Sequence, residues 1–217
     1  PLTDSPRECV QFYTTEASNP VHGAGLDGIE IHGANAYLPD QFLNERVNTR
    51  TDTYGGPVEN RARFSLQAVE GAVNVLRQER VGFRISPWGL STVSDMALEN
   101  PRPTFSHLVN KLRDRFPELA YRHVVESEVS DVHRWNDSIR EIWATHPLIS
   151  CGGYTRETAI DTAEAKGDSI AFLVPISRIS FTLPIVARHR ARGGEAPHDT
   201  RGSTEPVRHT DYPFARR

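Results

Sequence analysis

Segments with the pattern of β-strands alternate with segments of helical periodicity along most of this 217-residue chain. Short apolar or alternating runs bounded by Gly and Pro predict strands, and apolar residues spaced three and four apart predict helices. The strands are expected at residues 28–32, 80–87, 120–126, 147–151 and 169–174. Helices are expected at residues 58–76, 104–116, 137–145, 155–166 and 183–192, after an opening helix from Pro6. This alternation requires a parallel α/β sheet with right-handed crossovers, either an open doubly wound sheet or part of a (β/α) barrel.

Two of the helices carry end signals. Ser5 is followed by Pro6 and Glu8, a capping box with proline at the first helical position. Thr155 is expected to cap the helix that runs to residue 166, and Gly167 to end it.

Composition and charge exclude several function classes. Hydrophobic residues make up 37% of the chain and charged residues 24%, which is typical of a globular protein. The net charge of −3 gives no basic field, so no nucleic-acid partner is expected. No apolar run approaches the roughly 18 residues of a membrane span, and no secretion signal opens the sequence. Cys9 and Cys151 match no disulfide framework or zinc spacing, so a reducing, cytoplasmic compartment is expected.

Periodicity is lost near the end of the chain. Residues 1–192 are expected to form the α/β domain, and residues 193–217, rich in Gly, Pro, His and Arg, an irregular C-terminal tail. No GxGxxG or P-loop motif follows any strand, which weakens the nucleotide-binding doubly wound fold as an interpretation.

The first predicted strand ends in a cluster of polar residues. Ile29 and Ile31 point to one face, while Glu30 and His32 point to the other. Asn35 and Tyr37 follow within a few positions. A polar cluster at the carboxyl end of a strand is how a (β/α) barrel builds its active site. The alternative is a buried strand whose polar residues only satisfy one another.

The second strand brings two more polar residues to the same face. Arg84 and Ser86 join the polar face of the first strand, where a charge is costly unless it is paired or meets a ligand. A structural network of hydrogen bonds would stabilise this charge. A site for an anionic or strongly accepting ligand would also do so, with Arg84 as the fixed charge. His32 and Asn35 could then donate hydrogen bonds to a carbonyl or nitro oxygen, and the phenol of Tyr37 could donate a proton.

Gly152 and Gly153 end the fourth strand, directly before a predicted helix. Backbone N–H groups and the helix dipole make such a turn a candidate phosphate cradle, although a tight turn needs glycine just as much. Cys151 precedes the pair. No partner base is evident for it, so we expect no nucleophilic role for this thiol.

Several motifs in order resemble the old yellow enzyme family, FMN-dependent ene-reductases on a (β/α)₈ barrel. The matching segments are HGANAYL at 32–38, NTRTDTYGG at 48–56, ENRARF at 59–64, VGFRISP at 81–87, HVVE at 123–126, SCGGYTRE at 150–157 and TDYPF at 210–214. The fold class implied is an incomplete TIM barrel of about five parallel βα units.

The resemblance also implies roles for individual residues. His32 and Asn35 would hydrogen-bond the electron-withdrawing group of an enone substrate, and Tyr37 would protonate its α-carbon. Arg84 would contact the pyrimidine edge of FMN, with Gly152 and Gly153 by its phosphate. The implied reaction is ping-pong: NADPH reduces FMN, and hydride then passes to the substrate's β-carbon.

The chain departs from the family pattern in places. The family barrel has about three further strands before the opening helix, which suggests a truncated or rearranged product or a fragment, and uncovered edges predict self-association. The family's Gly-Arg pair after the last strand is missing, and Arg178 could substitute for it. The alternatives are a paralogue without flavin that serves as a partner subunit, and a flavin-independent isomerase or cyclase.

Overall fold

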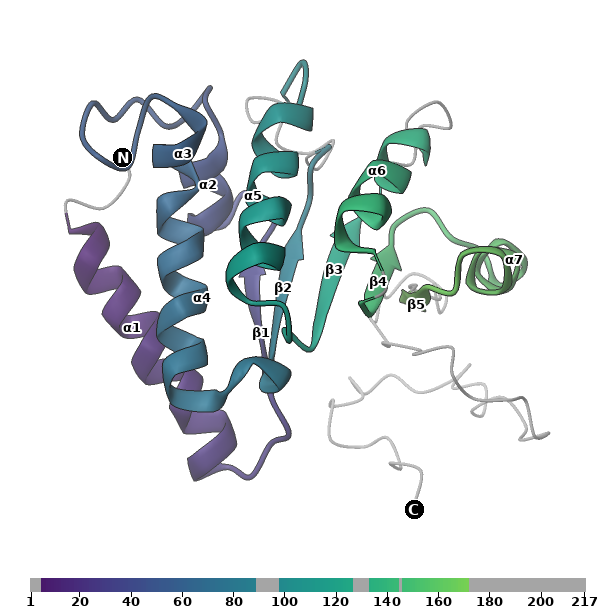
Figure 1. Cartoon of the computed structure of the whole chain (residues 1–217), viewed down its shortest axis with the longest axis horizontal. Coiled ribbons are helices and arrows are strands. Elements are labelled where there is room, and N and C mark those ends of the chain that lie inside the picture. Colours follow the sequence, from purple (N-terminus) through teal and green to yellow (C-terminus); the bar gives the residue numbers. More distant parts are fainter. Residues whose placement is uncertain (1–4, 89–97, 127–132, 145, 172–217) are drawn as a thin grey trace, which may run out of the picture.

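The centre of the protein is a sheet of five parallel strands, seen in a computed structural model that describes residues 5–88, 98–126, 133–144 and 146–171 (Figure 1). The strands are β1 (Ile29–Gly33), β2 (Val81–Ile85), β3 (Tyr121–Val125), β4 (Leu148–Cys151) and β5 (Ser169–Ala171). Each strand pairs with the next one along the chain. A doubly wound sheet reverses its strand order at a switch point, whereas a barrel adds strands in sequence. The sheet is therefore part of a (β/α) barrel, with five of its strands.

Helices alternate with these strands as the sequence predicts. They are α1 (Pro6–Ser18), α2 (Leu38–Leu43), α3 (Val58–Arg61), α4 (Arg63–Leu76), α5 (Arg102–Arg115), α6 (His133–Trp143) and α7 (Arg156–Lys166), with a π-helical turn at Asn19–Gly23 and a 3₁₀ turn at Gln78–Arg80. The helix expected at 58–76 is divided at Ala62 into α3 and α4. The helix expected at 183–192, the end of the fifth strand and the tail at 193–217 lie outside the described residues.

The helix-end predictions have different outcomes. α1 begins at Pro6 as expected, but Ser5 makes no side-chain capping hydrogen bond, so the predicted capping box is wrong. The backbone of Ser5 (φ −124°, ψ 78°) lies outside the extended conformation that aims an N-cap side chain at the first turn. Thr155 does cap α7, accepting from the backbone N–H of Thr158, and Gly167 ends that helix in the left-handed conformation.

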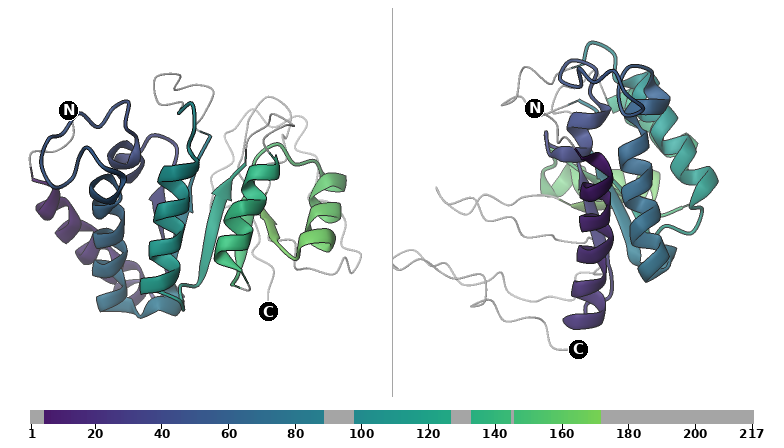
Figure 2. Two further views of the ribbon diagram at one scale, coloured as in Figure 1. Left: turned by 45° about the horizontal axis from the view of Figure 1, so that its top comes forward. Right: turned by 90° about the vertical axis from the view of Figure 1, so that its left-hand side faces the viewer.

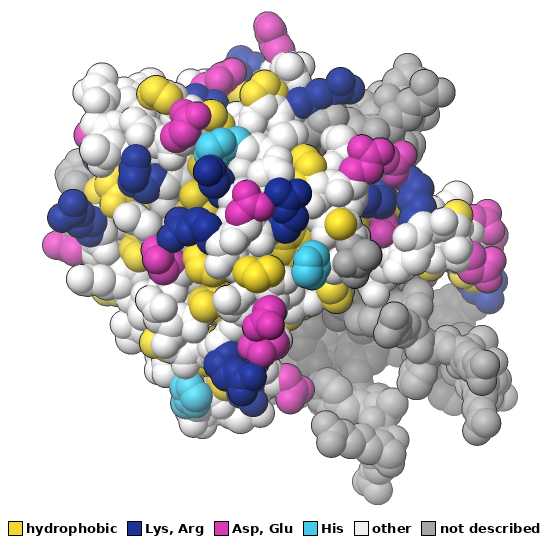
Figure 3. Space-filling view, in the orientation of Figure 1, with side chains coloured by type: hydrophobic (Ala, Val, Ile, Leu, Met, Phe, Trp, Pro, Cys, Tyr) yellow, Lys and Arg dark blue, Asp and Glu magenta, His cyan; other side chains and the backbone are white. Residues whose placement is uncertain are grey.

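The hydrophobic core lies between the sheet and one layer of helices. α4, α5 and α6 cover the same face, and α1 packs beside α4 (Figures 1 and 2). Alternate strand residues such as Ile31, Phe83 and Val124 point into this layer and are almost fully buried. The helix-covered side carries basic and acidic side chains interspersed, with no extended field of one sign (Figure 3).

The opposite face of the sheet is polar. Pairing sets His32 beside Arg84, and Arg84 beside His123, so these three side chains share this face, which would form the interior of a complete barrel. No described helix covers it (Figure 2). None of the helices in the described ranges has the length and apolar character to cross a membrane.

Candidate functional site

A strained turn directly follows β1 and forms part of the candidate site. Asn35 and Ala36 both adopt left-handed backbone conformations, with φ of 56° and 64°. The N–H of Asn35 donates to Ser86 Oγ over 2.7 Å, and the N–H of Ala36 donates to Asp40 Oδ2 over 2.9 Å. Ser86 in turn donates to the same Asp40 oxygen over 3.5 Å. Ser86 and Asp40 therefore hold a conformation that non-glycine residues adopt only at a cost.

The turn brings His32 and Tyr37 together. Their ring centroids lie 4.6 Å apart with an angle of 43° between the planes. Tyr37 is 59% exposed, so its phenol is open to a ligand. His32 is half-buried. Burial, assisted by the nearby guanidinium of Arg84, lowers the pKa of His32. Its imidazole is therefore neutral at pH 7 and offers one donor and one acceptor.

Three polar atoms of this cluster lack partners within the described residues. They are His32 Nδ1, Asn35 Oδ1 and Arg84 Nε, and all three are buried. A buried polar atom without a partner is costly, and its presence beside a strand end indicates a place for a ligand. His32 and Arg84 lie on adjacent strands and Asn35 follows directly, so one ligand could meet all three.

A second cluster lies further along the same face. His123 on β3 places Nδ1 2.9 Å from Glu30 Oε2 and Nε2 3.1 Å from Cys151 Sγ. Arg84 also approaches this sulfur, with its terminal nitrogen at 3.6 Å. The expectation that no base lies near Cys151 is therefore wrong. His123 is 28 residues away in the sequence, and only strand pairing brings the two side chains together.

The charge state of His123 follows from its partners. Burial alone would lower the pKa of His123, but hydrogen bonds with Cys151 and Glu30 outweigh it and raise the pKa to about 9. The pKa of Glu30 shifts in the opposite sense: burial acts to raise it, but the hydrogen bond and charge of His123, together with Arg84 and Tyr121, outweigh burial and lower it. The pair is therefore an imidazolium and a carboxylate at neutral pH.

Gly152 and Gly153 form a turn at the same edge of the sheet. Both have positive φ, 111° and 65°. A Cβ on Gly152 would lie 2.6 Å from the backbone oxygen of Glu126, so this position has room only for glycine. The turn leads into the Thr155 cap of α7. Both interpretations of the pair therefore remain: the glycines are required by the backbone, and the turn precedes a helix N-terminus suited to an anion.

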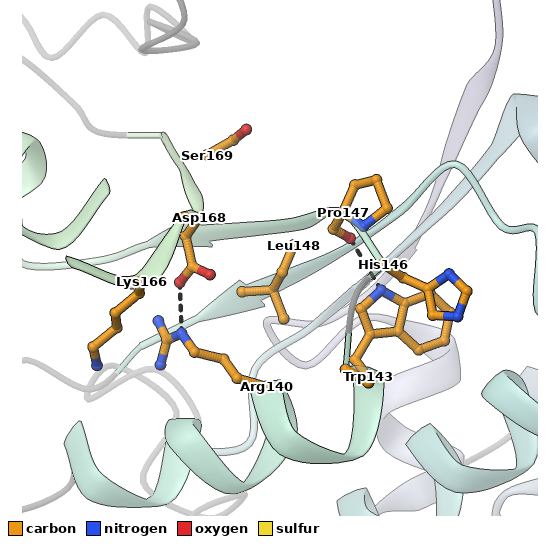
Figure 4. Close-up of a pocket in the computed structure, with 10 residues that line it drawn as sticks. Arg140, Trp143, His146, Pro147, Leu148, Lys166, Asp168 and Ser169 are labelled. Atoms are coloured by element: carbon orange, nitrogen blue, oxygen red, sulfur yellow. Dashed lines mark hydrogen bonds and ion pairs between the residues drawn. The ribbon is translucent and has the colours of Figure 1, made fainter. Parts of the chain in front are cut away.

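A cavity of about 420 Å³ lies at the other end of the strands. It is lined by residues at the start of β4 and β5, including Leu148 and Ser169, with Arg140 from α6 paired to Asp168 (Figure 4). In a parallel α/β fold chemistry belongs to the carboxyl ends of the strands, whereas this end contributes to stability. The cavity is therefore separate from the candidate site.

The residues at the carboxyl edge fit the flavin that the resemblance implies. The unpartnered Nε–H of Arg84 suits an acceptor on the edge of a planar ring, and its fixed charge suits an electron-rich one. The Gly152-Gly153 turn suits a phosphate in position and backbone conformation. Arg178, which could supply a further phosphate contact, lies outside the described residues.

Known proteins resemble this chain along most of its length. It is 37% identical over 170 residues to "Probable inactive dehydrogenase easA" of Claviceps purpurea (strain 20.1), covering 72% of this chain and 43% of the relative. It is 35% identical over 214 residues to "Chanoclavine-I aldehyde reductase fgaOx3" of Penicillium roqueforti (strain FM164), covering 94% and 56%. It is also 35% identical over 228 residues to "Putative 12-oxophytodienoate reductase 3" of Oryza sativa subsp. japonica, covering 98% and 56%. The chain thus spans about half the length of these relatives.

Solved structures agree with the sequence relatives. The structure of morphinone reductase in complex with tetrahydroNAD superposes with a TM-score of 0.69 at 33% identity, covering 78% of this chain and 45% of that one. Old Yellow Enzyme from Pichia sp. AKU4542 gives a TM-score of 0.64 at 32% identity, covering 76% and 43%.

The family model that describes FMN-dependent oxidoreductases matches residues 4–189, which is most of the chain. It confirms the resemblance seen in the motifs and indicates FMN as the cofactor. The chain belongs to the NADH:flavin oxidoreductase / NADH oxidase family.

Proposed function

We propose that the protein is an FMN-dependent ene-reductase, which uses NAD(P)H to reduce the activated C=C bond of an α,β-unsaturated carbonyl compound. The single observation that carries the proposal is the His32–Tyr37 pair, with ring centroids 4.6 Å apart, in a cluster that also holds Asn35 and the guanidinium of Arg84. Substrate, proton donor and flavin contacts would then share one edge of the sheet.

His32 and Asn35 would bind the carbonyl group of the substrate. A neutral imidazole and a carboxamide can each donate a hydrogen bond to the carbonyl oxygen of an enone. These bonds strengthen as negative charge develops on that oxygen, so they stabilise the transition state more than the bound substrate. Because Asp40 and Ser86 fix the intervening turn, the donors are held in place before substrate arrives.

Tyr37 would donate the proton. Its exposed phenol lies against His32 and can deliver a proton to the α-carbon of a substrate whose carbonyl is held by the neighbouring donors. Bound FMN would supply the hydride for the β-carbon. Arg84 would hold the flavin's pyrimidine edge, and Gly152 and Gly153 would face its phosphate. The tetrahydroNAD complex of morphinone reductase supports a nicotinamide coenzyme as the reductant.

Replacing Tyr37 by Phe tests the proposal. The variant is expected to oxidise NADPH and reduce flavin normally, while enone reduction slows by about 100-fold or more because the general acid is missing. Tyr13→Phe, a matched change on α1 in the helix layer, is expected to leave both half-reactions unchanged. Full-rate enone reduction by Tyr37→Phe would overturn the proton-donor role.

Flavin occupancy separates this proposal from its alternatives. Purified protein that is yellow and bleaches with NADPH under anaerobic conditions supports the reductase. A relative named a probable inactive dehydrogenase favours testing the flavin-free alternatives as well. Protein that stays colourless on reconstitution with FMN would point to a partner subunit, and enone conversion without NADPH to an isomerase or cyclase.

We further propose that the enzyme is cytoplasmic and self-associates into a homo-oligomer. β1 forms one edge of the sheet within the described residues, and an unpaired strand edge favours pairing with a second copy. Sedimentation velocity is expected to show species larger than the 24.3 kDa chain, and a monodisperse monomer would contradict this.

A further inference from the structure

A cysteine, a histidine and a glutamate from three strands form a line across the inner face of the sheet. His123 on β3 lies between Cys151 at the carboxyl end of β4 and Glu30 on β1, at 3.1 Å and 2.9 Å. Glu30 reaches His123 across β2 at Gly82, and the ring of Tyr121 occupies the space that a side chain at Gly82 would need. The order of groups, thiol to imidazole to carboxylate, is that of an activated nucleophile with an oriented base.

The surroundings of the sulfur carry positive charge. Hydrogen bonds with its two partners raise the pKa of His123 to about 9 against the effect of burial, so this side chain is an imidazolium at neutral pH. Both ring nitrogens are then donors, and Cys151 Sγ must be the acceptor. Arg84 brings a second cation to 3.6 Å from the same sulfur. The sulfur thus meets two cationic donors, which is the kind of electropositive surrounding in which reactive cysteines are found.

The charged or titratable groups on this face also act electrostatically on Cys151 and His123. They come from β1, β2 and β3 and are Glu30, His32, Arg84 and Tyr121. His32 is held neutral, and burial together with Glu30 raises the pKa of Tyr121, so neither adds a charge at neutral pH. The net field at Cys151 therefore comes from two cations and one carboxylate.

We propose that Cys151 is a nucleophilic thiolate that adds covalently to small activated alkenes, with His123 as proton donor and Glu30 as the residue that positions His123. Cys151 is half-buried, so a small carbon electrophile can reach the sulfur. The addition needs neither flavin nor nicotinamide coenzyme, so it can be tested without the reductase reaction, although Arg84 belongs to both proposed sites.

The addition balances without any further reactant. An electron pair on Cys151 Sγ forms a C–S bond to the β-carbon of the alkene, and the π pair moves to the α-carbon and its carbonyl oxygen. The proton on His123 Nε2 then passes to the α-carbon. The products are a thioether and a neutral imidazole, with no net oxidation or reduction.

Alkylation by N-ethylmaleimide, itself an activated alkene, tests the proposal without NADPH. Mass spectrometry of the digested full-length chain separates Cys151 from Cys9, a half-buried thiol on α1 that packs against an aromatic cluster. We expect Cys151 to react at least about tenfold faster than Cys9 at neutral pH. Its rate should change little between about pH 6 and pH 8, while the rate at Cys9 rises with pH.

Variants distinguish the effect of the His123–Glu30 ion pair on Cys151 reactivity from the effect of thiol exposure alone. His123→Asn is expected to slow Cys151 at least about tenfold and to restore a rate that rises with pH, whereas the matched His107→Asn on α5 changes neither. Glu30→Gln should move the rise in the Cys151 rate to higher pH, and it serves as the test if His123→Asn does not fold. Equal rates at Cys151 and Cys9 in the unmodified chain, or an unchanged pH profile in the folded variants, would overturn the proposal.

Discussion

Asp40 Oδ2 accepts the backbone N–H of Ala36 over 2.9 Å and so holds an alanine in a left-handed conformation with φ of 64°. That conformation costs a non-glycine residue about 1 kcal/mol or more. Ser86 links the same carboxylate to the N–H of Asn35. One buried carboxylate therefore maintains the turn on which the proposed substrate donors stand.

The ionisation of Asp40 should make stability depend on pH. Burial raises its pKa from 3.8 to about 6, although hydrogen bonds from Ala36 and Ser86 act to lower it. The folded state thus binds this proton more tightly than the unfolded state. The resulting stabilisation is complete below pH 3.8 and is lost as the pH rises through about 6. We expect the free energy of unfolding of the wild type, relative to Asp40→Asn, to fall by about 2–3 kcal/mol between acid and neutral pH. Urea unfolding measures this, and parallel pH profiles for the two proteins would contradict it.

Arg61 should be a major source of stability in the loop that precedes α3. Its guanidinium donates to the backbone oxygens of Leu43 at 2.9 Å and Gly56 at 2.5 Å, and to Thr104 Oγ1 at 2.9 Å. Arg61→Met leaves these acceptors unpaired, so we expect a loss of about 2–4 kcal/mol in the free energy of unfolding. Arg77→Met, at an 80% exposed side chain, is expected to stay within about 0.5 kcal/mol of wild type. Equal effects of the two changes would refute the argument.

The parts of the site that lie on one continuous segment could be predicted from the sequence. His32, Asn35 and Tyr37 come from a single strand and its turn, and the alternation of a strand fixes which side chains share a face. The same rule separates Arg84 from its apolar neighbours on β2. For His32 and Arg84 these predictions depend only on local periodicity, which is the strongest signal a single sequence carries, whereas Asn35 and Tyr37 follow in the turn beyond β1 and were linked to the site by their closeness in the sequence.

The parts that depend on contacts between distant segments could not be predicted in the same way. The approach of His123 to Cys151 follows from the register between β3 and β4, which periodicity does not fix. The role of Asp40 was missed for a related reason. Its carboxylate lies on α2, a short helix absent from the prediction, and bonds back to the preceding turn.

Gly152 should not tolerate a side chain. Its φ of 111° is unfavourable for any other residue, and an added Cβ would lie 2.6 Å from the backbone oxygen of Glu126. Gly152→Ala is therefore expected to lower the free energy of unfolding by about 2–3 kcal/mol. Gly25→Ala is the matched control, because Gly25 also has positive φ (73°) but open space where the Cβ would lie, and about 1 kcal/mol is expected there. Chemical denaturation of both variants separates the steric cost from the backbone cost, and equal losses would show that the contact with Glu126 relaxes freely.

Arg122 is a charge that the fold buries without a hydrogen-bonding partner. It points from β3 into the helix layer, where it is fully buried, and none of its three side-chain nitrogens has a partner within the described residues. Its guanidinium carbon lies 4.4 Å from the ring centroid of Trp143 and 5.6 Å from that of Phe83. Such cation–π contacts recover about 2 kcal/mol, whereas an uncompensated buried charge costs several.

Replacing Arg122 by Met should therefore stabilise the protein. Methionine is shorter but unbranched, flexible and apolar, so it can fill much of the space beside the two aromatic rings without a charge. We expect the free energy of unfolding to rise by about 1–4 kcal/mol, measured by urea denaturation. Arg115→Met removes a partly exposed guanidinium that also stacks on an aromatic ring, that of Phe116, and is expected to change stability by less than about 1 kcal/mol. A loss of stability in Arg122→Met alone would mean that stacking on Trp143 and Phe83 outweighs the cost of desolvation. The arginine would then be a structural element of the core, because its two aromatic neighbours would be supplying the interaction that hydrogen bonds normally provide.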